Sequence, residues 1–308
     1  MTGESVSLGS PSGAAPARGA QHIDPVDDAL RALELFSLSP LALGGVHVRG
    51  WHGPRRQALL GWLRRACLAG AAGGWHVLPH HTEADQLDAV TDLAESLRQG
   101  RPVVRAGLLD RFAGGVVVLQ RAERVSPGLA ARLASALDSQ RIALLALDES
   151  LPDEDGPGPV LLDRLALSID LRDESAWRAL DALAALDRSD GTLHDTRRPA
   201  PDVTRMATGA RGLTELCRAM LLLGIDSMRR GVQASVLARL SALEARRRPS
   251  AEADTPHDAD LAFAIRQVLL PRATTLPALP DQDSAAPQET QPQAPPEPDS
   301  AELPPEPP

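Results

Sequence analysis

Lysine is missing from this 308-residue chain, so all 32 of its basic residues are arginines. In nucleotide-binding loops a lysine ammonium group reaches the β- and γ-phosphates, and the planar guanidinium group of arginine is not a like-for-like replacement there. The absence of lysine therefore argues against ATP hydrolysis by this chain on its own.

Cysteine and long apolar runs are also scarce. The two cysteines, Cys67 and Cys217, lie far apart in the sequence. No uninterrupted apolar run is long enough to span a bilayer, and no basic-then-apolar leader with a small-residue cleavage site opens the chain. We therefore expect reduced thiols, no integral membrane segment and a cytoplasmic location.

Excess negative charge is concentrated at the end of the chain. The formal net charge is −9, but residues 276–308 carry seven carboxylates and no basic residue, so the remainder carries only −2 by subtraction. That balance gives no support to a nucleic-acid partner. His76, His80 and His81 lack a cysteine or a spaced carboxylate partner in a defined motif, so we expect no metal site there.

Residues 43–63 have the pattern of a strand, a glycine-containing turn and a helix. An apolar alternation leads into Gly50 and Gly53, and apolar residues at helical spacing follow. When the template G-x-x-x-x-G-K-[ST] is laid over the chain from Gly50, its second glycine, its lysine and its hydroxyl residue fall in turn on Arg55, Arg56 and Gln57. The layout predicts a phosphate-binding loop whose usual chemistry has been replaced. The alternative is an ordinary turn between a strand and a helix.

A second position needed for hydrolysis is also altered. Two glycines introduce a purely aliphatic strand, Val116–Leu119, which is typical of a buried parallel sheet. In nucleoside triphosphatases the next two residues are acidic, one for the Mg²⁺ shell and one that polarises the attacking water. Here they are Gln120 and Arg121.

Composition and periodicity divide the chain into four regions. Residues 1–24, rich in Gly, Ser, Ala and Pro, are expected to be a disordered leader. Strands that alternate with helices over residues 25–172 imply a parallel sheet covered on both faces. Only helical patterns follow over residues 173–275. Residues 276–308, with eleven prolines, are expected to form an acidic disordered linker or tail.

Within these regions the periodicity predicts individual helices. Thr82 is a possible capping residue, and the segment from Thr82 to Gly100 is expected to be one helical stretch. In the later region, two of the expected helices cover about 212–229 and 230–247.

Six segments, in a fixed order over roughly residues 25–277, carry a family resemblance: VHVRGWHGPRR, LPHHTEADQL, RPVVRAGLLDRFAGGVVVL, LDRLALSIDL, GARGLTEL and VLLPRATTLP. With them the chain resembles the ATPase-like part of the D-type subunits of magnesium chelatase, a family within the AAA+ superfamily. The resemblance implies an α/β fold with a P-loop parallel sheet covered by helices over 25–172, and an all-helical lid subdomain over 173–275.

In that family, the D-type protein resembles a degenerate partner of the I-type protein, which is an AAA+ ATPase. The two assemble as rings, and a third, large porphyrin-binding subunit inserts Mg²⁺ into protoporphyrin IX at the entry to chlorophyll and bacteriochlorophyll synthesis. The resemblance implies that Arg164 occupies the arginine-finger position, that Arg211 is the sensor-2 arginine, and that Asp148 lies in the sensor-1 region. A finger of this kind stabilises γ-phosphate charge on a neighbour's nucleotide, so ATP and Mg²⁺ are expected at an intersubunit site.

The chain departs from the family pattern at two places. The family usually has a β-hairpin between the elements that Ser139–Ile142 joins almost directly, so that insertion is expected to be short or absent. The family's C-terminal integrin-like domain, with its D-x-S-x-S metal site, does not occur in the sequence.

Three functions are compatible with these observations. The first is a ring component of magnesium chelatase that does not hydrolyse ATP and passes on movement produced by the I-type ATPase. The second is an independent ATPase or chaperone of the related MoxR type, and the third is a structural adaptor with an empty nucleotide site. At the residue level, Arg164 can instead form a surface ion pair with Asp163 or Asp170, and Arg211 can be an exposed residue before a helix.

Overall fold

A computed structural model describes residues 25–68, 73–172, 178, 203, 206–246 and 255–276 of the chain. By its internal contacts the chain divides after Leu276, and the described residues all belong to the first part. The leader predicted at 1–24 and the tail predicted beyond Leu276 lie outside the described residues, as does most of the stretch from 173 to 205. The predicted domain boundaries therefore stay predictions.

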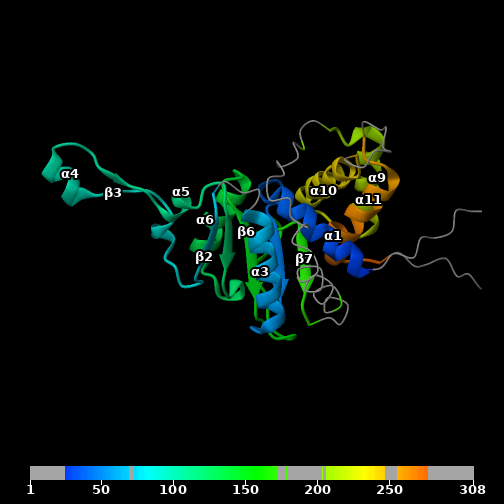
Figure 1. Cartoon of the computed structure of the whole chain (residues 1–308), viewed down its shortest axis with the longest axis horizontal. Coiled ribbons are helices and arrows are strands. Elements are labelled where there is room, and N and C mark those ends of the chain that lie inside the picture. The colour runs from blue at the N-terminus through cyan, green and yellow to red at the C-terminus, as the bar shows by residue number, and fades with distance from the viewer. Residues whose placement is uncertain are drawn as a thin grey trace, which may run out of the picture. The chain divides into compact units, whose positions relative to one another are not determined.

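A five-stranded parallel sheet forms the centre of the described structure (Figure 1). Its strands, in spatial order β2-β5-β6-β1-β7, are β2 (Trp75–Leu78), β5 (Val116–Leu119), β6 (Ala143–Asp148), β1 (Gly45–Arg49) and β7 (Leu167–Asp170). Every residue of β5 and β6 is buried, as expected for aliphatic strands that are covered on both faces. β1 lies between β6 and β7. One crossover leads from β1 past β6 and β5 to β2, and another leads from β6 past β1 to β7 at the opposite edge. In open parallel sheets, ligands bind beyond the carboxyl ends of the strands at such a switch of direction.

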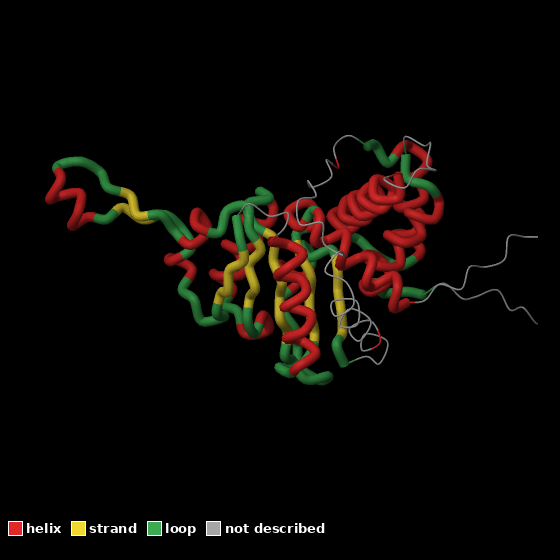
Figure 2. The backbone as a smooth tube through the Cα atoms, viewed as in Figure 1, coloured by secondary structure: helices red, strands yellow, loops and turns green. Residues whose placement is uncertain are grey.

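Helices cover both faces of the sheet. Alternate strand residues point to opposite faces, so Val116 and Val118 join one apolar cluster while Val117 and Leu119 join the other. The first face carries α1 (Pro25–Leu38), the short α2 (Pro40–Leu43) and α3 (Pro54–Leu68), which lies in front of the sheet and runs alongside its strands in Figure 2. The second face carries α6 (Pro127–Asp138) and α7 (Pro159–Leu162).

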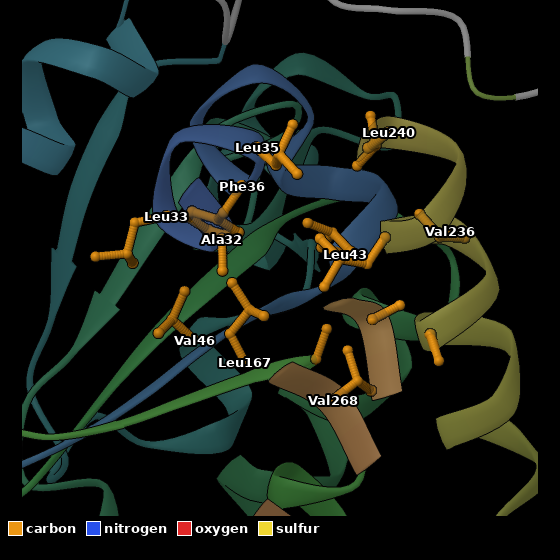
Figure 3. Close-up of a cluster of buried hydrophobic side chains, with 14 of the residues drawn as sticks. Ala32, Leu33, Leu35, Phe36, Leu43, Val46, Leu167, Val236, Leu240 and Val268 are labelled. Atoms are coloured by element: carbon orange, nitrogen blue, oxygen red, sulfur yellow. The ribbon is translucent and has the colours of Figure 1, made fainter. Parts of the chain in front are cut away.

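The described helices after β7 contribute to the first apolar cluster. They are α9 (Gly209–Leu222), α10 (Met228–Arg246) and α11 (Asp258–Ala264), followed by a π-helical turn η4 (Ile265–Leu269) and a 3₁₀ turn η5 (Leu270–Arg272). Figure 3 shows side chains from α1, β1, β7, α10 and η4 meeting in this cluster. The predicted break between helices at 229/230 was wrong. The chain turns earlier, at Gly224, whose φ of 62° ends α9 in the left-handed region.

The stretch between β2 and β5 also differs from the prediction. Instead of one helical segment from Thr82 to Gly100, it forms η1 (Ala84–Gln86), β3 (Val90–Thr91), α4 (Leu93–Gln99), β4 (Val104–Arg105) and α5 (Leu108–Arg111). The Thr82 hydroxyl donates to the Pro79 carbonyl and caps no helix. The cap of α4 is Asp92, whose carboxylate accepts the Glu95 N–H at 3.0 Å.

The expected shortening between α6 and β6 is confirmed. Only residues 139–142 separate the end of α6 at Asp138 from the start of β6 at Ala143. A further 3₁₀ turn, η2 (Ala122–Arg124), follows β5 and brings the chain back towards α6.

Candidate functional site

The predicted strand-turn-helix at Gly50 is present. Gly50 directly follows β1, donates its N–H to the Asp148 carbonyl at 2.9 Å, and has a φ of 145° that other residues rarely adopt. A Cβ at this position would also lie 2.8 Å from the Leu171 Cβ. The helix α3 begins at Pro54, a residue without an N–H, so its first turn offers one backbone donor fewer to an anion than an ordinary helix start.

Arg56, at the position of the phosphate-loop lysine, is turned into the protein. It is only 5% exposed. Its Nη1 donates to the Gly50 carbonyl at 3.2 Å, its Nη2 donates to His52 Nδ1 at 2.9 Å, and Nη2 lies 2.7 Å from Glu149 Oε1. Both terminal nitrogens of the guanidinium group are therefore engaged by groups of its own chain.

The neighbours of Arg56 on the helix point outward. Arg55 and Gln57 are both exposed, and the Gln57 amide lies 3.1 Å from His52 Nε2. Gly53 has open space around it and accepts the Gln57 N–H at its carbonyl, 3.1 Å away. Of the residues predicted for the phosphate loop, the structure thus brings Gly50, Arg56 and Gln57 together around His52.

Gln120 and Arg121 follow β5 at the same edge of the sheet, as predicted. Both are exposed, and Arg121 has a φ of 50°. Its Nε donates to Glu149 Oε2 at 3.2 Å. The position where a nucleoside triphosphatase has two acids therefore presents a positive charge.

Glu149 connects the two altered positions, and the sequence analysis missed it. One carboxylate oxygen pairs with Arg56 and the other with Arg121. Burial by itself would raise the pKa of this carboxyl, but the hydrogen bond and charge of Arg56, followed by those of Arg121, outweigh it and lower the pKa. Period-two alternation along β6 was the available signal: Leu145 and Leu147 face α3, so Glu149 faces α3 as well.

Asp148, predicted for the sensor-1 region, points to the opposite face. Its Oδ2 lies 2.9 Å from His47 Nε2, and its Oδ1 accepts the Ser150 N–H at 2.9 Å. Burial alone would raise the pKa of Asp148, which is 1% exposed, but the hydrogen bonds from His47 and Ser150 lower it to about 2. The sensor role of Asp148 stays a prediction, and the acidic group that meets the phosphate loop is Glu149.

A cavity of about 600 Å³ opens beside the phosphate loop, between α3 and the strands β2, β5 and β6. Apolar side chains, including those of Leu60, Trp75 and Val118, form part of its wall. The charged and polar residues of its lining are His52, Arg56, Gln57, Arg64, His80, His81, Gln120, Arg121 and Glu149. Among these described residues Glu149 is the single carboxylate.

Arg164 lies at the other end of the sheet. It precedes β7, and a Cβ on Gly44, at the start of β1, would come within 2.4 Å of the Arg164 carbonyl. Its side chain is 19% exposed and pairs with Asp138 through two bonds, Nε to Oδ1 at 3.0 Å and Nη2 to Oδ2 at 2.6 Å. Its ion-pair partner is thus Asp138, whereas the sequence suggested Asp163 or Asp170.

Arg211 is near the start of α9, as expected, and is 79% exposed. Its Nη2 pairs with Asp258 at 3.0 Å. The structure does not bring Arg211 into contact with Arg164 or with the phosphate loop in any interaction that we observe among the described residues.

Other possible sites give no additional chemistry. No group of three or more His, Cys, Asp or Glu side chains in the described ranges is placed to hold a metal ion. Cys67 and Cys217 are free thiols, and burial raises the pKa of Cys67 to about 12. Within the part of the chain that the structure describes, no helix is both long and apolar enough to cross a membrane.

Comparison with known proteins gives two similar curated sequences. The magnesium-chelatase 60 kDa subunit of Rhodobacter capsulatus is 38% identical over 244 residues, which are 79% of this chain and 41% of that protein. The magnesium-chelatase 60 kDa subunit of Cereibacter sphaeroides is 35% identical over 265 residues, which are 83% of this chain and 42% of that protein. The chain thus spans about two-fifths of the length of the curated relatives it matches. No protein-family model matches it.

Among solved structures, a candidate ATPase from Cytophaga hutchinsonii is similar with a TM-score of 0.51. The alignment covers 79% of this chain and 84% of that one at 12% sequence identity. At such low identity the likeness concerns the fold alone. Together with the parallel strand order, it confirms the predicted α/β fold of AAA+ type.

Proposed function

We propose that this chain, which belongs to the magnesium-chelatase AAA+ family, is a platform component of that enzyme and does not hydrolyse ATP itself. In this proposal it assembles in a ring with the I-type ATPase, and the large porphyrin-binding subunit is the third partner. The complex inserts Mg²⁺ into protoporphyrin IX at the entry to chlorophyll and bacteriochlorophyll synthesis. The observation that carries the proposal is the pairing of both Arg56 and Arg121 with the Glu149 carboxylate.

The chain's own phosphate loop does not fit a Mg²⁺–ATP complex. Mg²⁺ in such sites needs carboxylate oxygens and phosphates in near-ideal octahedral geometry. The residues after β5 are Gln120 and Arg121, and the one carboxylate of the cavity lining already neutralises two guanidinium groups. Arg56, moreover, donates inward to the Gly50 carbonyl instead of outward. This loop therefore lacks the ligands that a hydrolytic step would need.

The position of Arg164 supports a role at a neighbour's nucleotide. The loop at Gly50 and the contact between Gly44 and Arg164 lie at opposite ends of β1, a strand of five residues. At roughly 3.3 Å per residue the two ends are about 16 Å apart, so Arg164 is out of range of its own phosphate loop. The Arg164 guanidinium group donates to Asp138 and, at 2.7 Å, to the Val160 carbonyl, and Asp138 is 38% exposed. To act as an arginine finger, Arg164 would exchange Asp138 for the phosphate of an adjacent subunit's nucleotide.

Reconstitution of the complex tests this role. Arg164→Ala should lower ATP-dependent Mg²⁺ insertion by about tenfold or more, since arginine fingers contribute large factors to phosphoryl transfer. The isolated chain should show no ATPase activity before or after the change. Arg132→Ala is the matched control, because Arg132 is a surface arginine of α6 that pairs with Asp88 at 2.8 Å. Insertion that is unchanged in Arg164→Ala would remove the finger role.

The isolated chain and the reconstituted complex also test the two alternative functions, the independent ATPase and the structural adaptor. Turnover of ATP by the isolated chain, abolished by Arg56→Ala, would favour an independent ATPase of the MoxR type. A preserved complex with the I-type ATPase in which neither Arg164→Ala nor Arg211→Ala alters Mg²⁺ insertion would favour a purely structural adaptor. We assign Arg211 only a contributing role, because its pair with Asp258 is almost fully exposed.

A further inference from the structure

The cavity beside the phosphate loop has an excess of positive charge. Its lining contains three arginines, Arg56, Arg64 and Arg121, and one carboxylate, Glu149, so three cations face one anion. Glu149 engages two of them, and the Arg64 guanidinium group has no partner among the described residues. A volume of about 600 Å³ is within the range of small-molecule sites and exceeds what one carboxylate fills.

The arrangement around Glu149 is that of an oxyanion receptor. Arg56 approaches one carboxylate oxygen at 2.7 Å and Arg121 approaches the other at 3.2 Å. Guanidinium groups bind the O–P–O edge of a phosphate with the same forked geometry that they use for a carboxylate. The two arginines stand at the ends of α3 and β5 where phosphate-binding proteins place their phosphate and metal ligands.

We propose that Glu149 is a built-in competitor of the cavity, and that the cavity binds a diphosphate group without Mg²⁺ when this carboxylate is removed or displaced. Arg56 and Arg121 then bind the terminal phosphate in place of Glu149, and the unpaired Arg64 on the next turns of α3 binds the second phosphate. The arginines that pair with Glu149 also repel a divalent cation. The diphosphate group therefore binds without Mg²⁺. The inference concerns the isolated chain and does not depend on the partner role proposed above.

Titration calorimetry with inorganic pyrophosphate, in the presence of EDTA, tests the proposal on the full chain. Glu149→Gln keeps the shape of the side chain and removes its charge, and should bind pyrophosphate at least about tenfold more tightly than the original chain, because a charge-assisted pair no longer competes. Glu215→Gln is the matched control, since Glu215 is a half-buried residue of α9 that pairs with Arg218 and is not part of the cavity lining. It makes the same change in net charge and should leave the affinity unchanged.

The gain must also depend on the two freed arginines. Adding Arg121→Gln to Glu149→Gln should abolish it, and Arg64→Gln should reduce it. If Glu149→Gln and Glu215→Gln bind equally, or if the gain survives the loss of Arg121, the proposal is wrong. Failure of either kind leaves the test of Arg164 in the complex unaffected.

If Glu149→Gln does not fold, which would show as a loss of cooperative unfolding, Glu149→Asp provides a second test. Glu149→Asp keeps the charge but is too short to reach both guanidinium groups, so it should give a smaller gain in pyrophosphate affinity than Glu149→Gln. An affinity equal to that of the original chain would overturn the proposal. ATP in EDTA should follow the same order of variants if the cavity accepts a diphosphate group on a nucleotide. A gain with pyrophosphate but none with ATP would restrict the cavity to the free diphosphate.

Discussion

Two arginine–carboxylate clusters lie at opposite ends of β1. At its carboxyl end, Glu149 pairs with Arg56 and Arg121 beside the phosphate loop. At its amino end, Asp138 pairs with Arg164 at 2.6 Å and with Arg229 at 2.5 Å.

Each cluster joins a more buried arginine to a more exposed one. At the carboxyl end the side chain of Arg56 is 6% exposed and that of Arg121 is 49% exposed. At the amino end the side chain of Arg164 is 19% exposed and that of Arg229 is 38% exposed. Buried pairs are costly to break and slow to exchange, but exposed pairs contribute little and yield to a competing partner. The comparison distinguishes Arg56, which is held in the interior beside the Gly50 turn, from the three other arginines, which keep more contact with solvent.

The largest expected effect comes from removing Arg56, which has the most buried side chain of the four arginines. Arg56→Ala removes the bonds to Gly50 and His52 and leaves Glu149 with one partner, so it should lower the free energy of unfolding by roughly 2–3 kcal/mol. Urea denaturation of the isolated chain measures the change. Arg64→Ala, an exposed substitution on the same helix, should stay within about 0.5 kcal/mol of the original chain. Similar losses in both variants would contradict the distinction.

A second test extends the comparison to a fully buried carboxylate. The pKa of Asp148 is about 2, below its ordinary value of 3.8, so its stabilising effect is present above the ordinary value and is lost as the pH falls towards 2. That loss amounts to roughly 2 kcal/mol. Asp148→Asn should lack it, so the difference in unfolding free energy between the two proteins should shrink between about pH 5 and pH 2. A pH-independent difference would mean that His47 does not stabilise the charged form.

The smallest effect is expected at the amino end. Asp138→Asn releases Arg164 and Arg229 from a partly exposed carboxylate and should lower the free energy of unfolding by about 1 kcal/mol or less. Added salt should reduce this effect further, since exposed pairs are screened, and should change the effect of Arg56→Ala much less. Salt sensitivity that is equal for both variants would remove the contrast between the clusters.

The fold could be predicted from the sequence because its strands are aliphatic and its turns contain glycine. Val116–Leu119 and the residues around Gly50 formed the predicted elements within one or two residues. The helix expected from Thr82 failed for a local reason. Asp92 offers a stronger cap ten residues later, and the two-residue strands on either side of α4 pair with each other.

The candidate site was only partly predictable. The template located Arg56 and Arg121, since both follow buried strands or turns at fixed offsets. It could not show that they share one carboxylate, because Glu149 is 28 residues after Arg121 and the pair forms only when β5 and β6 lie side by side. The pairing of Arg164 with Asp138 has the same origin, as the partners come from different helical segments on one face.

The tight contact between Gly44 and the Arg164 carbonyl limits how a partner can use this arginine. Main chain meets main chain at that point with no room for even a methyl group, so the backbone of residue 164 is anchored beside the start of β1. Only rotation about side-chain bonds can then move the guanidinium group. Under the finger role proposed above, a neighbour's phosphate would have to come within the length of one arginine side chain of this anchored backbone.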